Sequence, residues 1–327
     1  MSRTQTTLAG LLVVQVALIL LVRSPFSGGS SAAETRPLLP MLEVLTPTQI
    51  ELLGDEQRRV SLIKDAQGWK LDGLGGFPAD NEKVDELIDD LRALQVRRPV
   101  VTSSRYHRTF KVADDENGGR VRLWDNPAED PDVELIVGSS SNYRAVHVRL
   151  GGDSKVYEVR DLAAYDMRAD AEAWIEKDLV DVPEGELVGL SIVNKNGSFE
   201  LVRQDDQWRA SGSEQALDTD EVDSLVRSAS SIQLAKPVGP KDATVHGFAE
   251  AAATVTLRYR PAGEPETADV SQIVVTIGAK PDEDSNERYI TRSDFEFTGR
   301  VWESSIRALL EQKLDDLLAD GDADATG

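Results

Sequence analysis

The three histidines, His107, His147 and His246, are the side chains of this sequence best suited to proton transfer near neutral pH. His107 and His246 each stand shortly before a phenylalanine, in the segments HRTF and HGF, which indicates equivalent positions of a repeated unit. Catalysis requires a partner acid or base within hydrogen-bond reach, so a structural role is expected for two equivalent histidines in separate domains. His147 alternates with Val146 and Val148, which predicts a strand residue that faces solvent.

Metal and phosphate motifs are incomplete in this sequence. The histidines lack the H-x-x-x-H and H-E-x-x-H spacings of zinc sites, and the chain contains no cysteine. The acidic run at 282–286 begins like a calcium loop, but Glu287 stands where that loop needs glycine. Glycines at 73–76 lack the lysine–hydroxyl pair of a phosphate-binding loop. We therefore assign no catalytic, metal-binding or cofactor-binding residue, and we do not expect an enzyme.

One basic cluster interrupts an acidic chain. The 36 lysines and arginines are outnumbered by 58 aspartates and glutamates, which gives a formal net charge of −22. Such an excess of carboxylates repels phosphate groups, so we expect no nucleic-acid partner. The segment RRPVVTSSRYHR is either a solvated edge or a contact face for an acidic partner. Its candidate contact residues are Arg97, Arg98, Arg105 and Arg108.

These residues must be positioned by a unit that the chain uses twice. The stretch 68–100 returns as 207–238, with Trp69 recurring as Trp208 and Pro99 as Pro237 at nearly constant spacing. Strand-like segments separated by turn residues precede each tryptophan and are typical of β-hairpins. Because both tryptophans follow apolar strands at equivalent positions, we expect them to pack in the cores of the two repeats.

A helix follows each tryptophan strand. Apolar residues recur at helical spacing after an aspartate that can cap the helix, Asp80 in the first copy and Asp218 in the second. Both helices should end before Pro99 or Pro237, because proline cannot continue a helix. The apolar residues are Val84, Leu87, Ile88, Leu91 and Leu94 in the first copy, and Val222, Leu225, Val226, Ala229 and Ile232 in the second.

Runs of short strands around one main helix predict an α+β fold. We expect two tandem repeats, each an antiparallel sheet with one amphipathic helix, behind an N-terminal transmembrane helix. The first repeat is assigned to residues 48–183 and the second to residues 184–318, and 319–327 to a disordered acidic tail. Each repeat is expected to close on a helical segment, at 171–179 and 304–318.

The N-terminal region carries an almost uninterrupted apolar run at 8–22. Residues 1–23 are therefore assigned to a membrane anchor or a signal, with a retained single-pass anchor, a cleaved signal peptide and a buried core helix as the alternatives. Residues 24–47 are rich in glycine, serine and proline and are assigned to a flexible linker. This arrangement predicts a cell-membrane protein with the bulk of its chain extracytoplasmic, in the periplasm.

The order of motifs in each unit resembles that of the domain-of-unknown-function 4340 family. The motifs are a strand, a W-K-L segment, an aspartate before an amphipathic helix, and the strand V-Y-E-V. Two such units cover about residues 45 to 318. The resemblance implies a membrane-anchored extracytoplasmic protein, often linked to ABC-type transport systems of the gliding-motility kind. No catalytic residue is established for that family, so none is carried over. This chain has no multi-span region of its own, so any transporter link would pass through a partner.

These observations predict a binding or scaffolding protein, an accessory subunit of an ABC-type transport complex. Two similar surfaces on one tether suit assembly better than catalysis. The alternative is a stand-alone envelope protein that binds a ligand between its two domains, where clefts commonly form. An exported hydrolase would need a convergent acid–base group, which the sequence does not provide.

Overall fold

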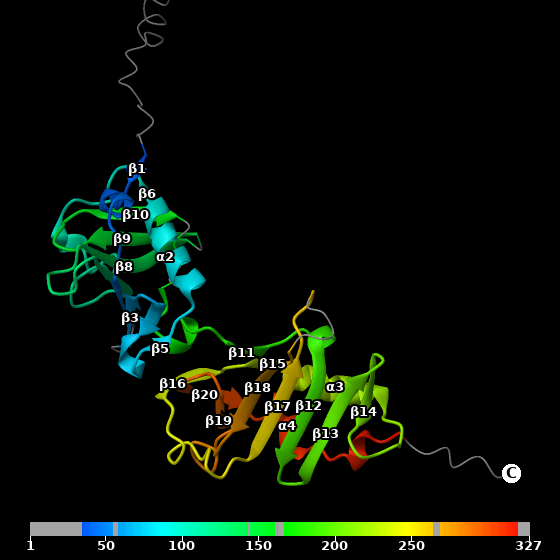
Figure 1. Ribbon diagram of the computed structural model, residues 1–327. Helices are drawn as coiled ribbons and strands as arrows, with labels where there is room; N and C mark the ends of the chain where they lie inside the picture. Colours follow the sequence, from blue (N-terminus) through cyan, green and yellow to red (C-terminus); the bar gives the residue numbers. More distant parts are fainter. Residues whose placement is uncertain are drawn as a thin grey trace, which may run out of the picture.

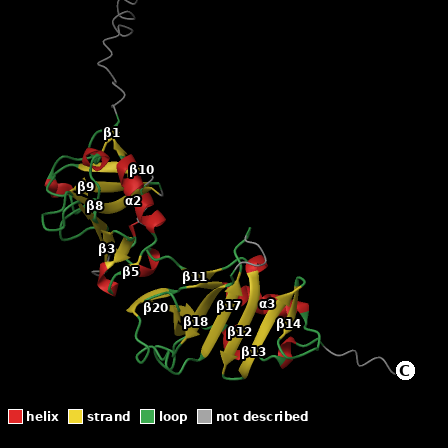
Figure 2. Ribbon diagram, in the orientation of Figure 1, coloured by secondary structure: helices red, strands yellow, loops and turns green. Residues whose placement is uncertain are grey.

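A computed structural model describes residues 35–54, 58–142, 144–160, 162, 167–263 and 269–319 (Figure 1). The predicted anchor at 1–23 and nearly all of the predicted tail at 319–327 lie outside these residues. Within the described part of the chain, no helix is long and apolar enough to cross a membrane. Strands dominate and helices are few (Figure 2).

The first half of the chain forms an eight-stranded sheet in the order β10-β9-β8-β7-β2-β3-β4-β5, and every neighbouring pair is antiparallel. The main helix of this half is α2 (Asn81–Ala93). The strands are β2 (Gln49–Leu53), β3 (Arg59–Asp65), β4 (Gly68–Leu71), β5 (Phe77–Pro78), β7 (Gly119–Trp124), β8 (Val133–Asn142), β9 (Ala145–Leu150) and β10 (Val156–Arg160).

The second half forms another eight-stranded antiparallel sheet, in the order β14-β13-β12-β17-β18-β19-β20-β16. Its helices are α3 (Thr219–Ser230) and the short α4 (Arg307–Glu311). The strands are β12 (Leu187–Asn194), β13 (Gly197–Gln204), β14 (Gln207–Ala210), β16 (Lys236–Pro240), β17 (Ala253–Tyr259), β18 (Ser271–Ile277), β19 (Glu287–Arg292) and β20 (Phe297–Trp302).

Seven of the eight strands in each sheet repeat in the same order, and the eighth differs, with β5 beside β4 in the first sheet and β16 beside β20 in the second. Strands β2, β3, β4, β7, β8, β9 and β10 correspond in order to β12, β13, β14, β17, β18, β19 and β20. A two-stranded ladder accompanies each sheet, β1 (Arg36–Pro37) with β6 (Gln95–Val96) in the first and β11 (Asp178–Asp181) with β15 (Ser231–Gln233) in the second. The mostly antiparallel architecture with two sheet-rich repeats is therefore confirmed.

Both main helices begin where the sequence predicts. The Asp80 carboxylate accepts a hydrogen bond from the backbone N–H of Lys83, and the Asp218 carboxylate accepts from Asp220 and Glu221. The apolar stripe of α2 is buried against the sheet, with Val84 and Leu91 fully covered.

The predicted closing helices are much shorter than expected. At 171–179 only a 3-10 turn, Ala171–Ala173, forms, because Ile175 bridges Ala79 and the next residues enter β11. At 304–318 the chain forms α4 and a second 3-10 turn. The side chain of Asn194 donates to the carbonyl oxygens of Leu309 and Gln312, which satisfies the C-terminal end of α4 and fixes where it stops.

Part of the predicted linker is built into the first repeat. Leu38, Leu39 and Leu42 are buried in the core, and β1 pairs with β6. Burial of these leucines favours ordering of the segment, which its prolines alone would leave extended.

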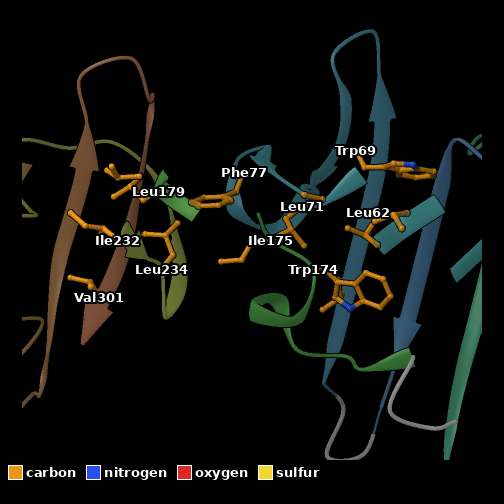
Figure 3. Close-up of a cluster of buried hydrophobic side chains, with 14 of the residues drawn as sticks. Leu62, Trp69, Leu71, Phe77, Trp174, Ile175, Leu179, Ile232, Leu234 and Val301 are labelled. Atoms are coloured by element: carbon orange, nitrogen blue, oxygen red, sulfur yellow. The ribbon is translucent and has the colours of Figure 1, made fainter. Parts of the chain in front are cut away.

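Aromatic and aliphatic side chains join the two repeats. Phe77 of β5 packs against Phe295 and Phe297 of the second repeat, with ring centroids 5.5 Å and 5.3 Å away. Figure 3 shows Phe77 and Ile175 between the strands of the two repeats. Arg292 adds a polar contact across this region by donating to the Leu179 carbonyl at 2.8 Å.

Candidate functional site

The four candidate arginines differ in how they are engaged. Arg97 and Arg98 follow β6 directly, are exposed, and have no ion-pair partner among the described residues. Arg105 lies over the ring of Tyr106, 4.5 Å from its centroid, and donates to its hydroxyl at 2.7 Å. Arg108 instead forms ion pairs with Asp115 and Glu116 in its own loop. The guanidinium groups of Arg97 and Arg98 are therefore open to a partner, and that of Arg105 has no carboxylate beside it among the described residues.

Arg97, Arg98 and Arg105 lie on one segment that passes beside β10, the edge strand of the first sheet, and this segment also carries two exposed apolar residues, Val100 and Tyr106. We call these five residues the arginine surface. Val100 is 45% exposed and Tyr106 is 37% exposed. Hydrogen bonds join this segment to the start of β10 at two places. The Val100 N–H donates to the carbonyl of Val156 at 2.7 Å, and the His107 ring contacts the carbonyl of Ser154 at 3.0 Å. A mixed cationic and apolar surface of this kind suits a protein partner.

The prediction that His147 faces solvent is wrong. Its side chain is 9% exposed, its Nδ1 lies 2.9 Å from the carbonyl of Ser139, and its ring packs on Phe110 at 4.6 Å. The loop before β7 folds over this face of the sheet and places Val112 there, in a small core of its own. Strand alternation identifies the face of a residue, but it does not reveal that a distant loop covers that face.

His246 is a buried titratable group of the second repeat. Its Nδ1 lies 2.9 Å from the Thr298 hydroxyl and accepts the backbone N–H of Asp242 at 3.2 Å. Burial lowers the pKa of His246 below its ordinary value of 6.5. The Asp242 carboxylate accepts the N–H groups of Thr244 and Val245, which holds its own pKa low. These bonds organise a turn around a neutral imidazole.

The arrangement around the histidines does not assemble a metal centre. His107 bonds to Ser154 in the loop before β10, His147 to Ser139 of the neighbouring strand β8, and His246 to Asp242 of its own loop. Among the residues that the structure describes, no group of three or more histidines, aspartates and glutamates is placed to hold a metal ion.

The two repeat tryptophans have different environments. Trp69 is 1% exposed, as predicted, and its indole N–H donates to Asp85 at 3.2 Å. Trp208 was expected in a core as well, but it is only half-buried and lines a cavity of about 1160 Å³. The difference arises because β4 is covered by β5, whereas β14 is the last strand of its sheet.

This cavity is the feature that sequence reasoning missed. It lies between β14, the loop 211–217 and the start of α3. In the first repeat Phe77 of β5 stands three residues before the helix cap Asp80. The corresponding place in the second repeat, three residues before Asp218, is Gln215. That exchange of an aromatic for a polar residue is the signal that distinguishes the two loops.

Comparison with known proteins gives one match. The family model described as Domain of unknown function (DUF4340) matches residues 69–249, a single stretch that begins in β4 and ends after β16. No curated protein and no solved structure matches. The match covers more than half of the chain and crosses from one sheet-rich repeat into the other, so the chain belongs to the DUF4340 family.

Proposed function

We propose that this protein is a membrane-anchored, extracytoplasmic binding and scaffolding protein that serves as an accessory subunit of an ABC-type transport complex. The arginine surface is the observation that carries this proposal. The exposed guanidinium groups of Arg97 and Arg98 have no ion-pair partner among the described residues, although carboxylates are plentiful on a chain with a formal net charge of −22. Their complement is an acidic protein surface.

The position of this surface supports a partner in or near the membrane. Strand β1 is the first described strand, and its Arg36 pairs in register with Val96, the residue before Arg97. The arginine surface therefore lies where the chain enters the first repeat. If the apolar run at 8–22 is a retained anchor, this end of the molecule is the one nearest the bilayer.

Ligand binding between the two repeats has less support. Phe77, Phe295 and Phe297 contact one another where β5 meets the second repeat. A junction filled by aromatic rings stabilises the pair of repeats but leaves less room for a small molecule.

The test is crosslinking in native membranes, followed by purification in mild detergent and mass spectrometry of the recovered proteins. The variant Arg97→Glu/Arg98→Glu reverses the charge of the surface. We expect transporter subunits to be recovered with the wild-type protein and to be lost with this variant.

The matched control is Arg307→Glu/Lys313→Glu, which makes the same charge change at exposed positions of α4 and the residues after it. This control should keep the partners. Recovery of the wild-type protein alone, or equal loss of partners with both variants, would contradict the proposal.

A further inference from the structure

We propose that the outer edge of β14 and the adjoining cavity bind an extended peptide segment of a partner protein, which is added to the sheet as a strand antiparallel to β14. The ligand is a stretch of main chain that carries one aromatic or aliphatic side chain. This site is separate from the arginine surface and does not depend on the function proposed above.

In the first repeat the corresponding strand edge is already paired with a segment of the chain itself. Its β4 is covered by β5, an extended segment that runs antiparallel to it. The N–H of Ala79 donates to the carbonyl of Trp69 at 2.9 Å, and the N–H of Gly76 donates to the carbonyl of Leu71 at 3.1 Å. The N–H of Trp69 is satisfied by the side chain of Asn81 at 2.8 Å. The fold itself therefore identifies an extended peptide as the group that fits this edge.

In the second repeat the same edge is open. Trp208 corresponds to Trp69, and β14 has no neighbour on its outer side. The N–H of Ser211 donates to Glu200 of β13 at 2.8 Å, so alternation along the ladder turns the backbone groups of Trp208 and Ala210 outward. The carbonyl of Ala210 accepts from Ser213, but no described residue pairs with the outward N–H and C=O of Trp208. An unpaired strand edge of this kind is a template for strand addition.

The edge of β4 is paired and the edge of β14 is not because contacts with the second repeat stabilise β5 on its strand. Phe77 is 1% exposed because it is buried against Phe295 and Phe297 of the following repeat. The second repeat is not followed by another repeat among the described residues, and its Gln215 is exposed. Without an apolar anchor, the loop 211–217 forms no strand on β14 and leaves the cavity between them.

The cavity indicates the side chains that the peptide should carry. Trp208, Leu217 and Val222 line the cavity and give it apolar surface beside the open edge. An aromatic or aliphatic side chain placed opposite Ala210 would take the place that Phe77 has opposite Leu71 in the first repeat. Burial of that side chain and pairing of the main chain would act together.

A second copy of this chain is a poorer occupant. The rings that receive Phe77 are Phe295 and Phe297, in and before β20. The corresponding turn of the first repeat, residues 150–155, contains no aromatic residue. If the first repeat of a second copy docked on this edge, it would therefore lack the aromatic rings that Phe295 and Phe297 supply at the junction within one chain.

The test uses a synthetic peptide with the sequence of residues 74–81, LGGFPADN, in which the phenylalanine is replaced by a photoreactive benzoylphenylalanine. The full-length protein in detergent is titrated with this peptide and then irradiated. We expect saturable binding and crosslinks within residues 202–223. The control peptide is N-methylated at its alanine, which removes the N–H that would donate to Trp208 and should weaken binding by roughly tenfold.

A protein variant gives a second measurement. Trp208→Leu removes the ring at the edge and should weaken binding, whereas Trp302→Leu changes an exposed tryptophan elsewhere on the second repeat and should not. The proposal is overturned if the N-methylated peptide binds as well as the unmodified one, if crosslinks fall outside residues 202–223, or if the unmodified peptide shows no saturable binding at millimolar concentration.

Discussion

Phe77 of the first repeat and Phe295 of the second repeat form an edge-to-face aromatic pair. Their ring centroids are 5.5 Å apart and their ring planes lie at 87°. Aromatic pairs in this geometry add stabilisation beyond the area that they bury. The contact has two consequences, because it holds β5 on the edge of the first sheet and it joins the repeats. A single side chain therefore links the local pairing of a short strand to the assembly of the whole chain.

Replacement of Phe77 by alanine tests this link. Truncation of a buried phenylalanine typically lowers the free energy of unfolding by about 3–5 kcal/mol, since it removes apolar contacts and leaves a cavity. We expect a loss of that size in urea denaturation and separate unfolding of the two repeats. Tyr106→Ala, at a residue that is 37% exposed, should change the stability far less. A single unfolding transition of unchanged midpoint in Phe77→Ala would contradict the assignment.

Gly138, inside β8, and Gly278, directly after β18, hold equivalent places in the two repeats, and both are closely approached by backbone. An added Cβ would overlap the carbonyl oxygen of Phe110 at Gly138 and that of His246 at Gly278. Because a carbonyl of the main chain cannot swing aside like a side chain, we expect either alanine variant to lower the free energy of unfolding by about 3 kcal/mol or more.

The comparison for these two variants is Gly73→Ala, where no atom lies within 4 Å of the new Cβ. Its thermal midpoint should stay near that of the wild type. If Gly138→Ala and Gly278→Ala melt together with Gly73→Ala, the close approach of the loops to these strands is wrong.

Arg149 is a buried cation that organises the loop over the first sheet. It is 2% exposed, and it donates to the carbonyls of Val112 at 2.7 Å and Asp153 at 3.3 Å and to the Asp114 carboxylate. Arg149→Met would leave the buried carbonyl of Val112 without its donor, so we expect a loss of about 2–4 kcal/mol in chemical denaturation. Asp114→Asn, whose side chain is 75% exposed, should cost about 1 kcal/mol or less. The reverse order of the two losses would rule out this role.

Acid should weaken the second repeat through His246. Its pKa is lowered by burial in the folded protein, so the unfolded chain binds a proton near pH 6.5 when the folded chain does not. The free energy of unfolding therefore falls as the pH drops through 6.5 and stops changing below the folded pKa. In His246→Asn an amide oxygen can replace Nδ1 as acceptor for the Asp242 N–H, and this part of the pH dependence should disappear.

The measurement is chemical denaturation of both proteins at several pH values from 8 to 5. At pH 8 the imidazole is neutral in both states, so that point reports the cost of the substitution alone. Curves that run parallel across the whole range would show that His246 does not contribute to the acid response.

Several features of the fold follow from the sequence because they depend on neighbours in the chain. Asp80 and Asp218 cap helices at the predicted residues, since a capping carboxylate reaches N–H groups only two or three residues ahead. The equivalence of Trp69 and Trp208 places their strands at the same position in two matching sheets. The arginines at 97 and 98 are exposed beside a short strand.

Tertiary contacts decided the rest, because they join residues that are distant in the sequence. His147 is covered by a loop that lies before its strand pair, and Trp208 is uncovered because no strand follows β14 at the sheet edge. Phe77 reads as an ordinary apolar residue in the sequence, and only its contact with Phe295, on a segment more than two hundred residues later, explains why β5 forms. The sequence thus determined that one unit is used twice. The difference between the covered edge at β4 and the open edge at β14 depends on which side chains a neighbouring repeat brings within van der Waals contact.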